Sequence, residues 1–364
     1  MGLEKKALAD THELPIRHYG DVHMGKVRSV YWLREDDRMR IIEQNGYNIP
    51  KVSELGVMIV SDRISAFECG WKGQEGLDGV PGKGAALNAI SLNWLEEFEK
   101  AGIARNHVIE SPHPLVWIVR KARPIRIEAI ARGYITGSMW RDYAQGTREF
   151  CGNQLPEGLK ENQKLPEMVL TPTTKGIIKG ISGIPERDDA NITRKQVLSN
   201  YRAFGFKSIG SVLRYEALLT EAFEHASSSL DSAGQILADT KLEFGYIQDN
   251  CHEEMIIIDE AVTPDSSRFW DKKAYEEGRI VENSKEGFRQ FLLNALDRNV
   301  LLDKARMEER TKLADSYKVP IEEMMKASEI YRGMAKKITG NYVPLSENPG
   351  EEMLCALSKY GLVK

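Results

Sequence analysis

The chain has few cysteines and no long apolar run. Its four cysteines lie far apart and form no Cys-x-x-Cys pair, which argues against a disulfide framework and against a zinc site. No run approaches the roughly 18 apolar residues of a membrane span, and the N-terminal segment lacks the apolar core of a signal peptide. We therefore expect a protein of the reducing cytoplasm that is neither secreted nor membrane-spanning.

The chain also lacks a large excess of one charge. The formal net charge is −4 over 364 residues, so neither nucleic acid nor an anionic membrane attracts the protein in general. Any phosphate binding must come from a local cluster of cations. Hydrophobic residues make up 41% and charged residues 29%, as in ordinary globular proteins. The length suggests about two domains, and we find no internal repeat.

A complete phosphate-binding loop motif is missing as well. Residues 20–26 fit the pattern G-x-x-x-x-G-K, but Val27 follows where the motif requires Ser or Thr, and no apolar strand precedes it. What remains is Gly25, where backbone can approach a ligand, beside the cations Lys26 and Arg28. This arrangement suits a triphosphate, although a surface strand with two solvated cations fits the same residues.

Residues 235–244 alternate in character as a β-strand does. Mostly apolar residues take one parity, and Asp239, Lys241 and Glu243 take the other. Carboxylates gathered on one face would repel one another, and a bound cation such as Mg²⁺, with one or two carboxylates and substrate phosphates as ligands, would relieve this. The alternative is the outer face of a half-exposed sheet, with its charges in water.

A second apolar run, residues 255–258, predicts an antiparallel hairpin with the first strand. If the turn centres near Asn250, Asp259 lies on the face that carries the Asp-x-Lys-x-Glu pattern, whereas a one-residue slip moves it to the other face. Residues 263–268 then bring hydroxyls, an acid and an arginine into a turn directly after the strand, where functional loops tend to lie.

The remaining segments predict a mixture of strands and helices. The predicted elements are a buried strand at 57–60, a helix through 87–98 that stops at Gly102, two strands between 116 and 138 broken at Pro124, an irregular region at 142–193, a helix at 197–230, and mostly helical sequence at 269–364, with one helix opened by Pro320 and ended by Gly340. We can assign no role to the polar insertion near 34–51.

Three of these segments have features of binding sites. The Gly-rich loop 76–84, with its lysine before a helix, is suited to an anion. The basic strands around Pro124 suit a small-anion pocket better than a nucleic-acid surface, because no base-stacking aromatics are interleaved with the cations. The polar residues 61–68, just after a buried strand, fit either a functional site or a plain capping turn.

Eight motifs, taken together and in order, resemble one known family. They are GKVRSVY, SDRISAFE, VPGKGAALN, PIRIEAIARGYITGS, LPEGL, TPTTK, LADTKLEFG and DEAVTPDSSRFW, and they cover residues 20–290. In them the chain is similar to the SAICAR synthetases of purine biosynthesis. The resemblance implies an α+β fold with an antiparallel, kinase-like N-terminal lobe at 1–115, a larger ATP-binding α+β lobe at 116–300 and a helical C-terminal extension at 301–364, with ATP in the cleft between the lobes.

The resemblance also implies a reaction. The enzyme would use ATP to join L-aspartate to the carboxylate of 5-amino-1-(5-phosphoribosyl)imidazole-4-carboxylate (CAIR), with an acyl phosphate as intermediate and Mg²⁺ as cofactor. A carboxylate is a poor acyl donor because oxide would have to leave, and phosphate leaves far more readily. Phosphoryl transfer mainly requires positioning and neutralisation of charge. The expected partners are these small molecules and possible further copies of the chain, without nucleic acid or membrane.

The matched motifs imply a role for each candidate residue. The implied roles are catalysis for Lys241, Arg268 and Asp239; ATP binding for Gly25, Lys26, Arg28, Lys83 and Glu128; substrate binding for Arg132, Ser138, Lys175, Asp189, Asp265, Ser267 and Arg289; and Mg²⁺ ligation for Glu243 and Asp259. The chain departs from the family pattern in having Glu68 for the usual Asp, Asp188-Asp189 for the usual His-Asp, and a longer link before that pair.

Two functions of other classes are alternatives to the ligase. A kinase-like phosphotransferase acting on a hydroxyl would need metal and base motifs of the HRD and DFG type, and neither occurs. A catalytically silent nucleotide-binding or regulatory protein would be favoured by the loss of a metal carboxylate or a substrate cation, and all of these residues are present. ADP release that requires CAIR and L-aspartate together would distinguish the ligase from both.

Overall fold

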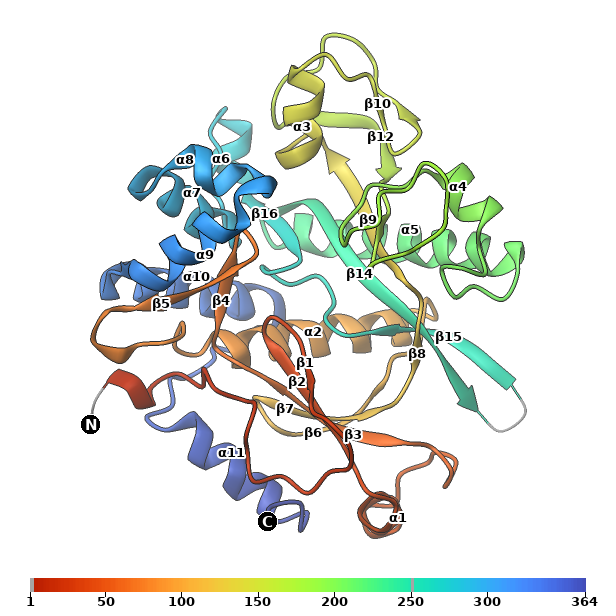
Figure 1. The fold of residues 1–364 in the computed structure, drawn as a ribbon, viewed down its shortest axis with the longest axis vertical. Coiled ribbons are helices and arrows are strands. Elements are labelled where there is room, and N and C mark those ends of the chain that lie inside the picture. The colour runs from red at the N-terminus through yellow and green to blue at the C-terminus, as the bar shows by residue number, and fades with distance from the viewer. Residues whose placement is uncertain (1–2, 250–251) are drawn as a thin grey trace. The chain divides into compact units, whose positions relative to one another are not determined.

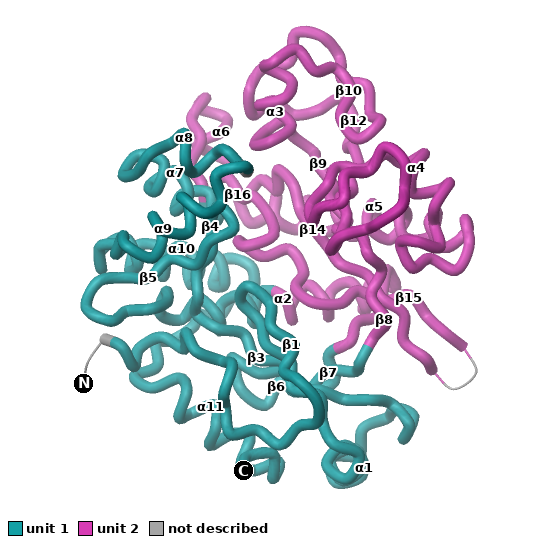
Figure 2. Tube along the Cα trace, in the orientation of Figure 1, with its two compact units in different colours: residues 1–90, 108–121, 283–364 teal, residues 91–107, 122–282 magenta. Residues whose placement is uncertain are grey.

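The computed structural model describes residues 3–249 and 252–364, and the chain divides into two compact units (Figure 2). Unit 1 comprises Met1–Ile90, Val108–Lys121 and Asn283–Lys364, and unit 2 comprises Ser91–His107 and Ala122–Glu282. This division differs from the predicted bounds of 1–115, 116–300 and 301–364, because the last 82 residues group with the N-terminal strands instead of forming a separate extension.

Unit 1 is built on a five-stranded antiparallel sheet with the order β1-β2-β3-β7-β6 (Figure 1). The strands are β1 (His23–Met24), β2 (Arg28–Trp32), β3 (Leu55–Val60), β7 (Val116–Arg120) and β6 (Val108–His113). The central strand β3 pairs with β2 and β7, and its apolar side chains are buried on both faces apart from a half-buried Met58. A continuous apolar run is the pattern expected for a strand in this position.

A smaller sheet and several helices complete unit 1. The sheet joins β17 (Lys318–Val319), β5 (Cys69–Gly73) and β4 (Ile64–Ala66). The helices are α1 (Glu35–Gln44), the start of α2 (Lys83–Lys100), α7 (Glu286–Ala295), α8 (Arg298–Leu302), α9 (Met307–Ser316), α10 (Ile321–Thr339) and α11 (Pro349–Ser358), with 3-10 turns at Leu3–Lys5, Gln74–Gly76 and Lys304–Arg306. Pro320 precedes α10 and Gly340, at φ 76°, ends it, which confirms both predicted helix boundaries.

Unit 2 is organised around β14 (Gln235–Asp249), which pairs with four other strands. The main path of its seven-stranded sheet is β12-β9-β14-β15, with β13 on β9 and with β16 and β8 on β14. These strands are β8 (Arg123–Pro124), β9 (Ile127–Tyr134), β12 (Lys164–Leu170), β13 (Thr173–Thr174), β15 (His252–Ile258) and β16 (Ser267–Asp271), and a separate ribbon joins β10 (Glu149–Phe150) and β11 (Asn153–Gln154).

The helices of unit 2 are α3 (Gly137–Ala144), α4 (Arg194–Ser199), α5 (Ile209–Ser232), α6 (Lys272–Glu276) and the end of α2. Helix α5 packs against β14 and β9, where its buried stripe, including Leu219 and Phe223, covers the sheet (Figure 1). Leu242 and Phe244 of β14 are buried as well. The core of the unit therefore lies between α5 and the central strands.

The structure confirms the α+β class and corrects two predicted segments. The region at 142–193 is not wholly irregular, because it contains the short strands β10 to β13 that extend the sheet of β9 and form the ribbon. The helix predicted at 197–230 is two helices, α4 and α5, and the Ser208 side chain caps the second. Over the described ranges, none of the helices is both long and apolar enough to cross a membrane.

Candidate active site

Strand β14 positions most of the predicted site residues of unit 2. Its neighbours are β9 on one side and β16 on the other, so that Asp239 lies opposite both Arg132 and Arg268. Lys241 pairs with Ile130 of β9, whose neighbours in that strand include Glu128 and Arg132. Charged side chains from three strands are thereby brought to one region, although Arg132 and Arg268 are 136 positions apart in sequence.

The first group, which we call the arginine cluster, consists of Arg132, Asp239 and Arg268. Oδ2 of Asp239 accepts hydrogen bonds from Nη1 of Arg132 at 3.0 Å and from Nη1 of Arg268 at 2.5 Å. The Asp239 and Arg132 side chains are only 6% and 8% exposed. Nε of Arg132 also donates to Oγ1 of Thr171 at 2.9 Å. A single buried carboxylate thus orients two guanidinium groups.

The charge balance of the arginine cluster favours an anionic ligand. Burial lowers the pKa of Arg132, and the adjacent Asp239 opposes that effect. Arginine remains protonated in proteins at all ordinary pH values. Two guanidinium cations therefore share one carboxylate, and the group carries a net positive charge that a carboxylate or phosphate can neutralise.

Gly137, at the start of α3, allows Arg268 its position. Gly137 has φ 60°, and a Cβ placed there would lie 2.5 Å from Nη2 of Arg268. The guanidinium group therefore lies against the beginning of α3, a helix whose second residue is the half-buried Ser138. Backbone N–H groups at a helix start attract anions. Arg132, predicted to bind substrate, and Arg268, predicted to be catalytic, are thus brought together at Asp239.

The second group, which we call the lysine cluster, contains Glu128, Lys175, Lys241 and Glu243. Nζ of Lys241 donates to Oε1 of Glu128 at 2.7 Å and lies 3.6 Å from Oε1 of Glu243. Lys175 forms an ion pair with the other oxygen of Glu243. The Glu243 side chain is 7% exposed, so the alternative of a solvated outer face is wrong for this strand.

The pKa values of the two lysines of this cluster are shifted in opposite directions. Burial lowers the pKa of Lys175, with the Lys241 ammonium acting in the same direction and Asp259 opposing it. Burial also acts to lower the pKa of Lys241, but the charge and hydrogen bond of Glu128, with contributions from Glu260 and Asp259, outweigh it and raise that pKa. Lys241 is thus the more firmly protonated of the two.

Asp259 reaches this region by a different route from the predicted one. Glu243 pairs with Ile258, so a regular strand would pair Asp259 with Leu242 and turn its side chain away from Glu243. The pairing register is therefore shifted by one residue from the one that would place Asp259 on the face of Glu243. However, β15 ends at Ile258, and Asp259 has φ 60°, which takes it out of the strand pattern. The predicted turn centre, Asn250, lies outside the described residues.

The oxygen atoms of Glu243 and Asp259 suit Mg²⁺. Within residues 3–249 and 252–364, no group of three or more His, Cys, Asp or Glu is placed to hold a metal with protein ligands alone. Mg²⁺ usually takes only one or two carboxylates, and water and phosphate oxygens complete its shell. Glu243 is a buried carboxylate in contact with Lys175, and the charge of Asp259 acts on that same lysine. The donor types therefore fit the predicted metal.

Three further substrate-binding candidates of unit 2 lie in β16 and in two loops. The Ser267 hydroxyl is buried and lies 2.7 Å from Oγ1 of Thr240, so it joins β16 to β14. Asp265 is half-buried in the preceding turn, where its N–H donates to Oγ1 of Thr263. The Asp189 N–H donates to the carbonyl oxygen of Thr174, which places its backbone next to Lys175.

The predicted ATP-binding turn lies in unit 1. Gly25 N–H donates to the carbonyl oxygen of Arg28 at 2.7 Å and closes the turn between β1 and β2. Lys26 is exposed at the turn. The Arg28 guanidinium group is buried, 5.8 Å from the centre of the Trp117 ring. The two cations therefore do not share one exposed face, and Lys26 alone of the pair projects freely into solvent.

Two more predicted cations belong to unit 1. Lys83 has no exposed surface, and its Nζ lies 5.2 Å from the centre of the Tyr331 ring. In this conformation its ammonium group lies against α10 and does not reach the surface, and its role in ATP binding stays a prediction. Arg289 lies on α7, where Nη1 donates to Oε2 of Glu286 at 3.2 Å.

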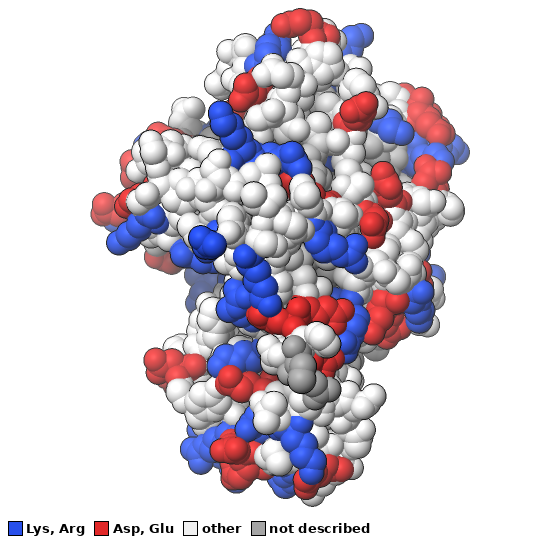
Figure 3. All heavy atoms as spheres, turned by 90° about the vertical axis from the view of Figure 1, so that its right-hand side faces the viewer, with Lys and Arg blue, Asp and Glu red and all other residues white. Residues whose placement is uncertain are grey.

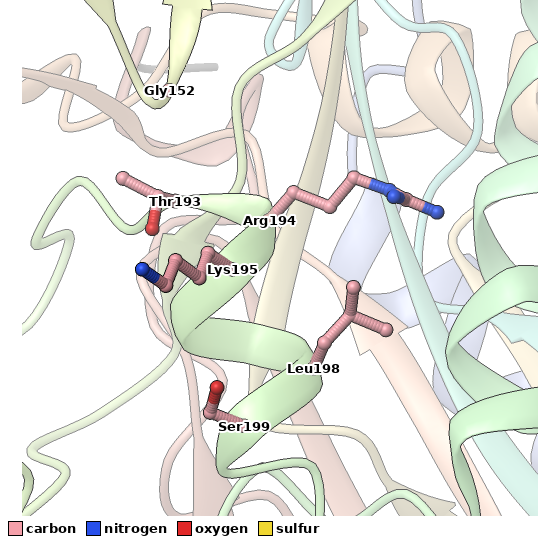
Figure 4. Close-up of a pocket in the computed structure, with 6 residues that line it drawn as sticks. All are labelled: Gly152, Thr193, Arg194, Lys195, Leu198 and Ser199. Atoms are coloured by element: carbon pink, nitrogen blue, oxygen red, sulfur yellow. The ribbon is translucent and has the colours of Figure 1, made fainter.

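One surface hollow carries none of the predicted residues. It is lined by Gly152, Thr193, Arg194, Lys195, Leu198 and Ser199 (Figure 4). Arg194 and Lys195 point in different directions there, and Arg194 is bound to Glu216. Thr193 already caps α4 with its own side chain. Acidic and basic groups are also interspersed over the face drawn in Figure 3, so that face offers no single-sign surface to nucleic acid.

Sequence reasoning missed three residues that shape these sites. Thr171, which accepts from Arg132, was recognised only as part of a motif. Gly137 belongs to the sequence ITGS of a matched motif, but only the structure shows that Arg268 approaches it closely. Asp62, fully buried in unit 1, accepts hydrogen bonds from the N–H groups of Leu8 and Gly84. A polar run directly after an apolar strand was its one signal.

The fold is of the α+β class, and the charges of the two clusters suit an enzyme with anionic substrates. The SAICAR synthetase family model matches residues 21–300. The chain is 55% identical to the phosphoribosylaminoimidazole-succinocarboxamide synthase of Vibrio parahaemolyticus and 52% identical to that of Colwellia psychrerythraea, over the whole length of both chains in each case. The chain belongs to the SAICAR synthetase family.

Solved structures agree with this assignment. The SAICAR synthase from Saccharomyces cerevisiae, complexed with SAICAR, is 25% identical, with a TM-score of 0.63 over 92% of this chain and 99% of that one. A SAICAR synthetase in complex with ADP shares the fold, with 20% identity and a TM-score of 0.57 over 88% of this chain and 99% of that one.

Proposed function

We propose that the arginine and lysine clusters of unit 2 bind and activate the substrates of the SAICAR synthetase reaction, and that the Gly25–Arg28 turn of unit 1 contacts ATP phosphates. The chain is an ATP-dependent ligase that joins L-aspartate to the carboxylate of CAIR and yields SAICAR, ADP and phosphate. The observation that carries the residue assignment is the pair of clusters on β14, one with excess positive charge and one with paired lysines and carboxylates.

The reaction has two chemical steps. A carboxylate oxygen of CAIR takes the γ-phosphoryl group of ATP, which gives an acyl phosphate and releases ADP. The amine of L-aspartate then attacks the acyl carbon, a C–N bond forms, the C–O bond to phosphate breaks, and the amine loses a proton. Both steps bring anions together, so neutralisation of charge and exclusion of water are the main tasks of the protein.

The arginine cluster suits the binding of substrate anions. Asp239 holds Arg132 and Arg268 with their orientations fixed before any ligand binds, so little conformational entropy is lost on binding. Ser138, at the start of α3, adds a hydroxyl beside Arg268. We assign these groups to the carboxylates of CAIR and L-aspartate, with Asp265 and Asp189 as supporting loop residues and Ser267 as a fixed link between strands.

The lysine cluster suits the phosphoryl-transfer step. Lys241, with its raised pKa, keeps a positive charge for the reacting carboxylate and the transferring phosphoryl group. Lys175 can exchange its contact with Glu243 for a substrate oxygen. Glu243 and Asp259 would hold Mg²⁺, which when bound neutralises charge on the nucleotide phosphates. Glu128 orients Lys241 through its 2.7 Å hydrogen bond.

ADP release tests the reaction directly. We expect sustained release only when CAIR and L-aspartate are both present, with the Glu243→Gln variant as a matched inactive control of the same shape. Sustained ADP release with CAIR alone, or with another acceptor in place of L-aspartate, would contradict the ligase. Binding of Mg²⁺-ADP, measured by titration, should be weaker in Glu243→Gln than in the wild type, and equal affinity would contradict the metal assignment.

A further inference from the structure

The tripeptide Ser61-Asp62-Arg63 follows β3 and takes no part in the chemistry described above. It forms no regular secondary structure, and its contacts alternate in direction as in extended backbone, where successive side chains point to opposite sides. Ser61 and Arg63 contact one neighbouring segment, and Asp62 contacts two others. The tripeptide therefore bridges parts of unit 1 that are remote in sequence.

On the first side, Ser61 and Arg63 hold the turn between β1 and β2. The carbonyl oxygen of Val27 accepts from the Ser61 N–H at 2.7 Å and from the Ser61 hydroxyl at 2.8 Å. Nε of Arg63 donates to the same hydroxyl at 3.0 Å, and Nη2 of Arg63 lies 3.4 Å from the carbonyl oxygen of Gly25. The carbonyl groups on either side of Lys26 are thus both fixed.

On the other side, Asp62 anchors the tripeptide. Its carboxylate accepts from the N–H groups of Leu8 and Gly84, each at 2.8 Å. Its carbonyl oxygen accepts from the N–H of Val80 at 2.8 Å. Because Gly84 lies in the first turn of α2, the anchor is part of a rigid helix start. The backbone of Ser61 and Arg63 is consequently held in place while their side chains bind the Gly25–Arg28 turn.

We propose that Ser61 and Arg63 are positioning residues that hold the Gly25–Arg28 turn in the conformation required by nucleotide phosphates. They act through the carbonyl groups of Val27 and Gly25, which fix the backbone that presents Lys26. This inference rests on the proposed role of the turn in ATP binding. Preorganised backbone of this kind lowers the entropy lost when a phosphate is bound.

The experiment compares Ser61→Ala, Arg63→Met and Arg63→Lys with Ser65→Ala, a matched control in β4 of the same motif. Loss of one buried hydrogen bond corresponds to about fivefold in affinity. We expect Ser61→Ala and Arg63→Met each to weaken ADP binding by about that factor and to raise KM for ATP, with KM for L-aspartate and the ADP affinity of Ser65→Ala unchanged. Arg63→Lys, which keeps one donor, should recover part of the loss.

Hydrogen exchange supplies a readout that does not depend on activity. Backbone amides of residues 22–33 should exchange faster in Ser61→Ala than in wild type, while those of β14 should not change. A folded Ser61→Ala variant with wild-type exchange in this segment and wild-type ADP affinity would overturn the proposal. If Ser61→Ala fails to fold, the Arg63→Met variant decides between the two outcomes, because the Arg63 side chain is less buried than that of Ser61.

Lys26→Met separates the two proposals. If Lys26→Met leaves ADP affinity unchanged, the assignment of this turn to phosphate binding is wrong. If Lys26→Met weakens ADP binding and neither Ser61→Ala nor Arg63→Met does, the assignment of the turn stands and the positioning role is wrong. Weakening by all three variants, with faster exchange at the turn, is the result that the positioning role requires.

Discussion

The arginine cluster and the lysine cluster lie four residues apart on β14, yet they are built on different principles. In the arginine cluster, Asp239 is bound by two arginines that stay charged at all ordinary pH values, and their side chains are only 8% and 18% exposed. In the lysine cluster, Glu243 shares its charge with Lys175 and Lys241, and the Lys175 side chain is 39% exposed. The first arrangement is largely buried, whereas the second has a partly exposed cation at its edge.

This difference indicates separate tasks. Removing one member of a buried ion pair leaves an uncompensated buried charge, which is strongly destabilising. A half-exposed lysine loses much less when its partner changes, because water solvates it. We therefore expect substitutions in the arginine cluster to act mainly on stability and substrate binding, and substitutions in the lysine cluster to act mainly on turnover.

The largest effect should come from Glu243→Ala. Loss of a metal carboxylate and of the partner of two lysines should lower kcat by about 1,000-fold or more, since each 1.4 kcal/mol of lost transition-state stabilisation corresponds to tenfold. The fold should persist, because β14 keeps its ladder and its core side chains. Steady-state ADP release and circular dichroism check this. A folded variant with wild-type turnover would contradict the role of Glu243.

Asp239→Ala should act chiefly on stability. The change leaves Arg132 buried without its carboxylate, which should lower the free energy of unfolding by about 3–5 kcal/mol. Urea denaturation of the two variants would compare them directly, and Asp239→Ala should have the lower midpoint. A larger loss of stability in Glu243→Ala than in Asp239→Ala would invert the distinction between the clusters.

Asp62 provides a third buried carboxylate, held by peptide N–H groups instead of arginines. Burial raises its pKa to about 6, against the hydrogen bonds of Gly84 and Leu8. Because the folded state binds the proton more tightly than the unfolded chain, this group contributes stability at low pH that is lost as the pH rises from about 4 to 6, up to roughly 3 kcal/mol.

The Asp62→Asn variant isolates that contribution. It lacks the titration but places an amide donor toward one of the two N–H groups, so it should be less stable than wild type throughout. The difference in Tm between wild type and variant should be largest near pH 4 and should narrow toward pH 7. A difference that stays constant or widens would exclude a raised pKa for Asp62.

The smallest effect should come from Gly137→Ala. The positive φ and the 2.5 Å approach to Arg268 both oppose a Cβ at this position, and together they should lower stability by about 1–2 kcal/mol. Displacement of Arg268 should also raise KM for CAIR with little change in KM for ATP. An unchanged KM for CAIR would show that the start of α3 and Arg268 are not coupled.

Much of the fold was predictable because its signals are local. Alternation predicted β14, Pro320 and Gly340 predicted the limits of α10, and the break at Pro124 predicted two strands where β7 and β9 lie. The division of the chain into units was less predictable, since the grouping of residues 283–364 with the N-terminal strands depends on contacts between segments hundreds of residues apart.

The site was predictable in composition but not in geometry. The motif residues of unit 2 do form two clusters, and strand parity explains why Asp239, Lys241 and Glu243 accompany one another. Parity failed for Asp259, because its left-handed backbone lies outside the alternation on which the prediction depended. The sequence also did not distinguish Lys26 from Arg28, although the turn exposes the first and the sheet buries the second.

The sequence by itself determined the family, the reaction class and the residue types at the site, because these are carried by short motifs whose chemistry is fixed by the side chains. The tertiary structure alone decided which charges meet. Arg132, Asp239 and Arg268 become one cluster only through the pairing of β9, β14 and β16. Pairing between distant strands depends on the whole core, and no local pattern of residues encodes it.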